Sequence, residues 1–159
     1  MGSDRLEVFR ITDFMTALII LENPIIARDI HEDGANKEFP DVVNEFWIGV
    51  SDFGFTFACF RVHQMGRAVW QIHARILPNY RSKFGEKATH LAIEWAFAYI
   101  PDIEVIVCLV PQCFRNVDLF VRRVGFKKVG FLERSYLRDG KLEDMKLYQI
   151  RGVKCQQQQ

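Results

Sequence analysis

The stretch that decides the fold covers residues 84–110 and reads FGEKATHLAIEWAFAYIPDIEVIVCLV. Its first part has apolar side chains at the period of a helix that buries one face, and Pro101 ends this pattern. Residues 105–110 are uninterrupted apolar sequence, which is typical of a strand buried on both faces within a parallel sheet. A helix followed directly by such a strand predicts a sheet that is covered by helices. The apolar residues on one face of the predicted helix are Phe84, Ala88, Leu91, Ala92, Trp95 and Tyr99.

Three short strands are predicted before this helix. They cover residues 45–51, 55–63 and 68–77. Short turns separate them, one at Asp52-Phe53-Gly54 and one at residues 64–67, and this spacing predicts an antiparallel meander. Pro78 ends the third strand because proline has no N–H to give to a strand ladder.

The amino-terminal part predicts a strand over residues 6–11 and then two helices. Thr12 is the expected N-cap of the first helix, with Asp13 in its first turn. Asn23 is the expected N-cap of the second helix, and Pro24 occupies its first position. This second helix extends to about residue 30 before a polar loop.

After the opening stretch, the sequence predicts a helix over residues 113–124, which Gly125 ends. A hairpin follows, with strands at residues 126–135 and 143–151 and Asp139-Gly140 in its connection. The order of elements predicts a mixed α/β sheet in a single domain over residues 1–152. The low-complexity tail is residues 153–159.

Composition supports one folded domain and excludes several classes of protein. The chain has 159 residues, with 21 Lys and Arg against 20 Asp and Glu, and 49% of its residues are apolar. Such hydrophobicity with so little net charge excludes a disordered chain, and the lack of a basic excess argues against nucleic-acid binding. No apolar run approaches the roughly 20 residues of a membrane span. We expect a reduced, cytoplasmic protein whose cysteines form no disulfide framework.

Other candidate chemistry is sparse. The four histidines have no paired metal-ligand spacing, so we expect no metal site. Cys113 lies at the start of a predicted helix, where a thiol is either activated or, as we favour, an ordinary residue of the capping region. The basic pairs Arg122-Arg123 and Lys127-Lys128 fit either an acidic partner or, the favoured reading, a solvated helix end.

The order of elements over residues 6–150 resembles the GNAT (GCN5-related N-acetyltransferase) superfamily. Residues 76–88, ILPNYRSKFGEKA, resemble the family's acyl-CoA pyrophosphate loop and the helix that follows it. Residues 124–130, VGFKKVG, resemble the Gly-Phe stretch after the fourth helix, and residues 136–141, YLRDGK, resemble the closing hairpin. With EWAF at residues 94–97, the sequence is closest in character to small GNAT-like proteins of tailed bacteriophages.

The resemblance implies that acetyl-CoA binds at the start of the long helix. A helix amino terminus presents unpaired N–H groups and a partial positive charge, which suit a pyrophosphate. The family's splayed strand end, here Ile76 and Leu77, pairs with the pantetheine arm. The alternative is a strand-to-helix turn with solvated basic residues. The residues implied in cofactor binding are Ile76, Leu77, Arg81, Ser82, Lys83, Gly85, Lys87 and Ala88.

Several positions depart from the family pattern. Phe84 and Glu86 stand where the loop usually has small residues, and they add bulk and negative charge beside a phosphate. Val121 stands where family enzymes often have the tyrosine that protonates the leaving thiolate, and valine has no proton to donate. Phe114 stands where an asparagine often begins the helix.

Acetyl transfer to an amine also needs a base. His73 is the candidate, because it is the only group on its face of the predicted strand, beside Gln71 and Arg75, that titrates near neutrality. The alternative, which the sequence favours, is a hydrogen-bonded strand histidine. Glu45 is a second candidate base, and its alternative is a solvated strand end.

Two functions stay open. The first is an acyl-CoA-dependent N-acetyltransferase, with acyl-CoA and an amine acceptor meeting in an open cleft between residues 68–77 and 105–110. The second is a catalytically inactive GNAT-fold structural or assembly protein of a bacteriophage virion, with the cleft filled and Phe84 as a candidate plug. Its partners would be other virion or assembly proteins, in the host cytoplasm or the virion. Neither function calls for a membrane.

Overall fold

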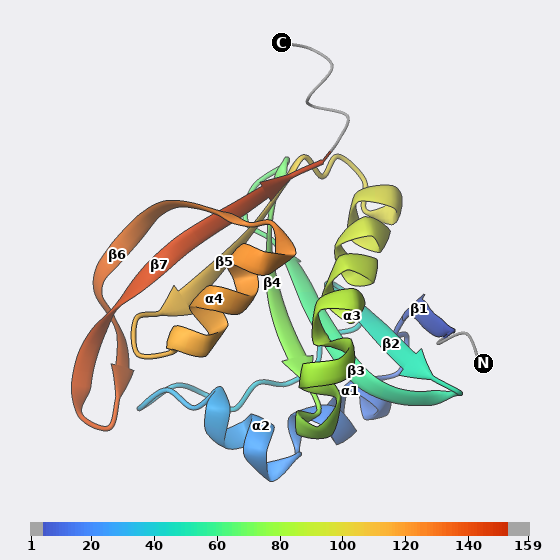
Figure 1. Cartoon of the computed structure of the whole chain (residues 1–159), viewed down its shortest axis with the longest axis horizontal. Helices are drawn as coiled ribbons and strands as arrows, with labels where there is room; N and C mark the ends of the chain where they lie inside the picture. Colours follow the sequence, from blue (N-terminus) through green and yellow to red (C-terminus); the bar gives the residue numbers. More distant parts are fainter. Residues whose placement is uncertain (1–4, 153–159) are drawn as a thin grey trace.

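The computed structural model describes residues 5–152, so the predicted tail at residues 153–159 lies outside the described residues. The fold is a seven-stranded mixed sheet with the strand order β1-β2-β3-β4-β5-β7-β6 (Figure 1). It confirms the predicted mixed α/β fold. In chain order the elements are β1 (Leu6–Arg10), α1 (Phe14–Leu21), α2 (Pro24–Asp29), β2 (Phe46–Asp52), β3 (Phe55–Gln64), β4 (Val69–Ile76), α3 (Pro78–Tyr99), β5 (Val105–Pro111), α4 (Arg115–Val124), β6 (Lys127–Arg138) and β7 (Lys141–Arg151).

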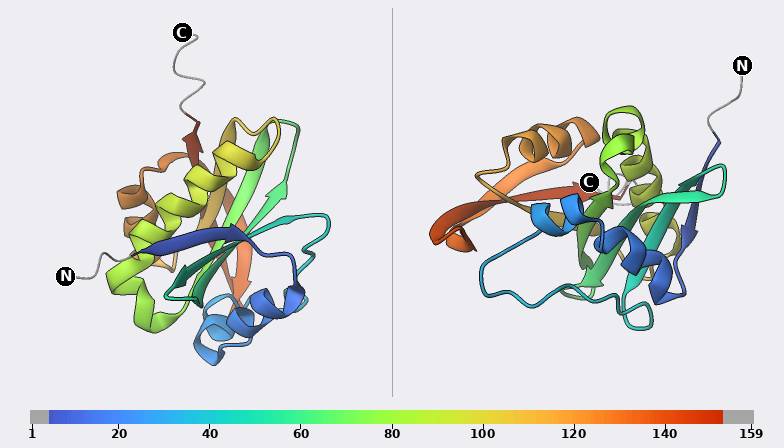
Figure 2. Two further views of the ribbon diagram at one scale, coloured as in Figure 1. Left: turned by 90° about the vertical axis from the view of Figure 1, so that its right-hand side faces the viewer. Right: turned by 90° about the horizontal axis from the view of Figure 1, so that it is seen from below.

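Two apolar clusters hold helices against the two faces of the sheet (Figure 2). On one face, Ala88 and Ala92 of α3 and Val121 of α4 share a buried cluster with β2, β3, β4 and β5. On the other face, α1 and α2 pack around Trp47 and Cys59. None of the helices within residues 5–152 has the length and hydrophobicity needed to cross a membrane.

The predicted meander and closing hairpin are confirmed. β2, β3 and β4 pair in antiparallel order, and β6 pairs antiparallel with β7. Asp139 and Gly140 both have positive φ, 51° and 73°, as a two-residue hairpin turn requires. Gly125 ends α4 in the left-handed region with φ 110°, as its position predicted.

The middle of the sheet opens because β4 and β5 run parallel but soon separate. Their pairs are Val69 with Val105, Trp70 with Ile106 and Gln71 with Val107. Beyond Gln71, β4 continues with partners in β3, and β5 continues with partners in β7. Within the described residues, the edges of β4 and β5 that face each other are therefore unpaired over the second half of both strands.

Two helix starts differ from the prediction. Asp13, not Thr12, is the N-cap of α1, because its carboxylate accepts the backbone N–H of Thr16 at 2.9 Å. α3 begins at Pro78, so the residues predicted as a loop before Phe84 form its first turns. Proline suits this place because its fixed φ matches a helix and its missing N–H costs nothing there.

Candidate functional site

A cavity of about 140 Å³ lies where β4 and β5 diverge. Side chains alternate along β4, so Ile72 and Ala74 line the cavity from the α3/α4 side, while His73 and Arg75 line it from the other face. The divergence thus opens the sheet between an apolar face and a polar one. The other lining residues are Thr89 on α3, Cys108, Leu109 and Val110 on β5, Val117, Phe120, Val121 and Val124 on α4, and Phe126.

His73 lies at the polar side of this cavity and contacts His63 on β3. Their Nε2 atoms are 3.1 Å apart. Burial, together with the nearby Arg75, His63 and Arg61, lowers the pKa of His73 to about 3. The imidazole is therefore neutral at pH 7, with a lone pair available. His73 is thus a hydrogen-bonded strand histidine that also lines the cavity, and its role as a base stays a prediction.

Two carboxylates hold two arginines beside the histidine pair. Glu45 accepts from Arg61 Nε at 2.7 Å and Nη2 at 2.6 Å. Glu38 accepts from Arg75 Nη2 at 3.1 Å and from Arg61 Nη1 at 3.4 Å. The four side chains are at most 28% exposed. Glu45 is thus a paired, half-buried group, and the expected solvated strand end is wrong. Glu38 was missed because it lies in a loop remote in sequence from both arginines.

Most of the residues implied in acyl-CoA binding lie on α3 rather than in a loop. Ile76 ends β4, and Leu77 is the single residue between the strand and the helix. Arg81 Nε donates to the Ile76 carbonyl at 2.9 Å, and its Nη1 contacts Asp29 at 2.9 Å. This guanidinium is therefore already engaged with the protein. Of the remaining residues, Ser82, Lys83 and Lys87 are exposed, whereas Gly85 and Ala88 are buried.

Phe84 belongs to the core and does not plug the cavity. Its ring centroid is 5.8 Å from that of Phe57 and 6.1 Å from that of Tyr80, and the residue is 5% exposed. Because α3 starts at Pro78, Phe84 falls on the helix face that packs on the sheet. Phe120 of α4 lines the cavity instead, with a ring carbon 3.6 Å from where a Cβ on Gly85 would stand.

Proton donors are scarce on the α3/α4 side of the cavity. Val121 lines it and has no proton to give. Two polar residues that sequence reasoning missed also line it, Thr89 and Cys108. The Thr89 hydroxyl donates to the Gly85 carbonyl at 2.8 Å, and burial raises the pKa of the Cys108 thiol to about 12. In the sequence Cys108 is one apolar position of a predicted buried strand. Its place in the cavity follows only from the divergence of β5 from β4.

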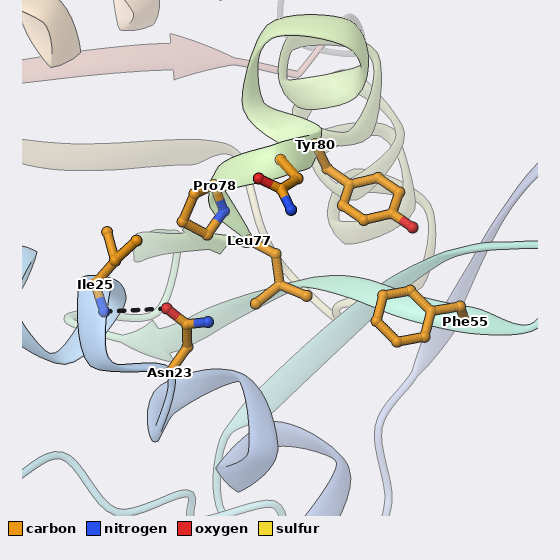
Figure 3. A pocket seen from close by; sticks show the side chains of 7 residues that line it. Asn23, Ile25, Phe55, Leu77, Pro78 and Tyr80 are labelled. Carbon is orange, nitrogen blue, oxygen red and sulfur yellow. Dashed lines mark hydrogen bonds between the residues drawn. The ribbon is translucent and has the colours of Figure 1, made fainter.

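A second cavity, of about 380 Å³, lies beside the start of α3 (Figure 3). Asn23 and Ile25 of the α2 start, Phe55 of β3 and residues 77–80 line it. Pro78 has no N–H, and the Tyr80 N–H is bonded to the Leu77 carbonyl at 2.9 Å. Of the first three residues of α3, Asn79 is the one whose N–H is left for a ligand such as a phosphate.

The other sequence candidates lie apart from the central cavity. Glu86 pairs with Arg123 at 2.9 Å, and Arg122 lies 3.6 Å from Asp118, so these arginines are partnered on the helix surface. Cys113 is a free, exposed cysteine. Within residues 5–152, no three or more His, Cys, Asp or Glu side chains are grouped to hold a metal ion.

The buried His73 predicts that stability falls on mild acidification. The pKa of His73 is about 3 in the folded protein, against the ordinary 6.5. Between these two pH values the unfolded chain therefore binds a proton at this histidine and the folded protein does not. The contribution of neutral His73 to the free energy of unfolding is complete above pH 6.5. It declines, by up to about 1.4 kcal/mol per pH unit, as the pH falls toward 3. Urea unfolding of wild type and His73→Gln at pH 7, 6 and 5 measures it. We expect the difference between the two free energies to shrink toward pH 5; parallel curves would contradict the buried, neutral state.

Solved structures of low sequence identity share this fold. A spermidine N-acetyltransferase (SpeG) mutant from Vibrio cholerae superposes with a TM-score of 0.75 at 15% identity, covering 94% of this chain and 95% of that one. The same enzyme in complex with CoA and spermine gives 0.75 at 14% identity, covering 94% and 96%. A protein assigned as a phosphinothricin N-acetyltransferase gives 0.71 at 14% identity, covering 92% and 98%. The predicted GNAT fold is therefore confirmed.

Sequence comparison adds the family. No curated protein matches the chain. A family profile described as "Protein of unknown function (DUF2824)" matches residues 14–158, which is most of the chain. The protein thus combines a GNAT fold with a sequence that is a member of the DUF2824 family.

Proposed function

We propose that the chain is an N-acetyltransferase that takes acetyl-CoA and an amine acceptor into the cavity between β4 and β5. The observation that carries the proposal is that this cavity opens in the middle of the sheet and is lined by His73. The fold of a spermidine N-acetyltransferase that holds CoA and spermine supports it, since the two chains share their topology over most of their length.

The unpaired edge of β4 suits the pantetheine arm. Residues 72–76 have no partner in β5, so the backbone N–H groups on that side of β4 can pair with the amide carbonyls of an extended ligand. The Ala74 and Ile76 carbonyls already accept hydrogen bonds from Arg75 and Arg81. The pyrophosphate would lie at the start of α3, near Leu77 and Asn79. Arg81, Ser82, Lys83, Gly85, Lys87 and Ala88 are the further residues proposed there, with the exposed lysines supplying positive charge.

His73 would act as the base toward the acceptor. The amine nitrogen attacks the thioester carbonyl, the C–N bond forms, and the C–S bond breaks with its electrons on sulfur. A neutral imidazole at the polar side of the cavity can take the proton that the amine loses. The thiolate would be protonated by water, because Val121 cannot serve as the acid.

Calorimetric titration of the purified chain with acetyl-CoA tests the proposal. We expect one site per chain with micromolar affinity, and thermal stabilisation equivalent to about 2.7 kcal/mol at a hundredfold excess over Kd. An acceptor screen that includes spermine and phosphinothricin would follow, with His73→Ala as its control. No heat and no stabilisation at millimolar acetyl-CoA would overturn the proposal.

The second candidate is a catalytically inactive GNAT-fold structural or assembly protein of a bacteriophage virion. The observation that favours it is the start of α3, where proline removes one N–H and Arg81 is bound to Ile76 and Asp29. The lack of a proton donor at Val121 points the same way. Its partners would be other virion or assembly proteins, and failure to bind acetyl-CoA is the outcome that it predicts.

A further inference from the structure

The His63 and His73 rings meet end to end rather than face to face. Their planes are 19° apart and their centroids are 5.2 Å apart, while the two Nε2 atoms are only 3.1 Å apart. The centroid separation exceeds the nitrogen separation by about two ring radii, so each Nε2 points at the other. This is the arrangement of an N–H···N hydrogen bond, in which one ring donates and the other accepts.

The surroundings of His63 decide which ring donates. Burial lowers the pKa of His63, and a contact with the Gln64 backbone opposes this lowering, as donation to a carbonyl does. Because Nε2 faces His73, the nitrogen left to donate to that carbonyl is Nδ1. A neutral imidazole carries one proton, so His63 Nε2 is the acceptor and His73 Nε2 the donor. The Nδ1 of His73 is then the basic nitrogen left on the cavity residue.

The charges around the pair favour a proton on His63 over one on His73. The groups that face the pair are Arg61, Arg75, Glu38 and Glu45. At His73 burial, Arg75, His63 and Arg61 all lower the pKa. At His63 burial and Arg61 lower the pKa, but Glu45, the Gln64 backbone and Glu38 oppose this. His63 is also nearer to solvent, on the strand away from the cavity.

We propose that His73 and His63 form a two-histidine relay that carries the proton of the acceptor amine from the β4/β5 cavity to solvent. This rests on the proposed acyl transfer. The amine proton moves to His73 Nδ1 as the C–N bond forms, and the Nε2 proton of His73 moves to His63 Nε2. His63 Nδ1 then gives its proton to water, and water supplies the proton that the CoA thiolate takes up. After the products leave, His73 Nδ1 loses its proton to water in the cavity, the shared proton returns to His73 Nε2, and His63 Nδ1 regains a proton from solvent, which restores the starting tautomers. His73 is the catalytic residue. His63 positions the His73 ring and accepts its Nε2 proton.

Long-range proton–nitrogen NMR spectra of the full chain test the direction of the relay without any substrate. We expect His73 protonated on Nε2 and His63 protonated on Nδ1 at pH 7. The reverse pattern, with a proton on His73 Nδ1, would leave His73 no lone pair for the amine and would overturn the relay.

Kinetics test the function of the pair. In His63→Gln the amide oxygen can still accept the His73 Nε2 proton, but it cannot carry the proton onward. With acetyl-CoA and a panel of spermine, phosphinothricin and lysine ethyl ester, we expect kcat to fall about 10- to 100-fold while KM for acetyl-CoA changes less than about twofold. The acid limb of the kcat–pH profile should also move. The matched control is His90→Gln, since His90 lies outside the pair and its Nε2 contacts the Val124 carbonyl at 2.9 Å. It should behave as wild type.

The outcomes separate the relay from the proposed function. Acetylation by His63→Gln at the wild-type kcat overturns the relay and leaves the acetyltransferase intact. Failure of wild type to bind acetyl-CoA, or to acetylate any amine of the panel, overturns both.

Discussion

Replacing Ala74 by Phe will weaken acetyl-CoA binding by about 100-fold or more, or about 2.7 kcal/mol, and will leave the protein folded. Ala74 is an exposed residue of β4 whose side chain lines the central cavity. That cavity, of about 140 Å³, is close to the ~150 Å³ that accommodates one benzene ring. The new ring would therefore occupy the space that the proposed ligand needs. Calorimetric titration measures the affinity, and urea unfolding checks the fold.

The matched control for this variant is Ala27→Phe. Ala27 is an exposed residue of α2, so the substitution adds the same ring at a site outside the cavity. We expect its affinity for acetyl-CoA to equal that of wild type. If Ala74→Phe binds acetyl-CoA as tightly as Ala27→Phe does, the ligand does not use this cavity.

Trp47→Ala will destabilise the fold by about 3–5 kcal/mol, which approaches the whole stability of an ordinary domain. Trp47 is fully buried and forms the centre of the cluster that holds α1 and α2 to the sheet. Truncation removes its apolar surface from the core and leaves a cavity that the surrounding strands cannot close. Equilibrium unfolding in urea measures the loss.

The matched substitution at this position is Trp47→Phe. The Trp47 Nε1–H is buried without a hydrogen-bond partner, so a phenyl ring keeps much of the packing and removes an unsatisfied donor. We expect a cost of about 1 kcal/mol. It also remains measurable if the alanine variant does not fold. Equal costs for the two variants would show that packing at Trp47 does not hold the layer in place.

The helix starts, caps and turns show which features of the fold local sequence patterns predict. The periodic face of α3, the caps at Asn23 and Gly125 and the Asp139-Gly140 turn were predicted because each depends on residues within one turn of chain. α3 starts earlier than the resemblance to a loop predicts, because Pro78 suits the first position of a helix. The cap at Asp13 was placed one residue early because Thr and Asp are both good caps and only the bond to Thr16 separates them.

The candidate site depends on contacts that local sequence patterns do not predict. His73 and the acyl-CoA residues were named from position and resemblance, but nothing in the sequence pairs His73 with His63 ten residues earlier. That contact depends on the register between β3 and β4. Glu38 reaches Arg75 from a loop that is 37 residues away in sequence. Phe84 packs in the core and does not plug the cavity, because the face of α3 on which it lies depends on where the helix begins.

Sequence alone determined the order of elements, the antiparallel meander, the buried parallel strand and the closing hairpin, because hydrophobic period, turn residues and caps act over short stretches of chain. Tertiary structure alone decided that β4 and β5 separate after Gln71, and that this divergence leaves a cavity with His73 on its polar side. It also decided that two imidazoles and two Arg–Glu pairs meet there. These contacts join residues far apart in the chain, so strand register and packing set them, and no local pattern records them.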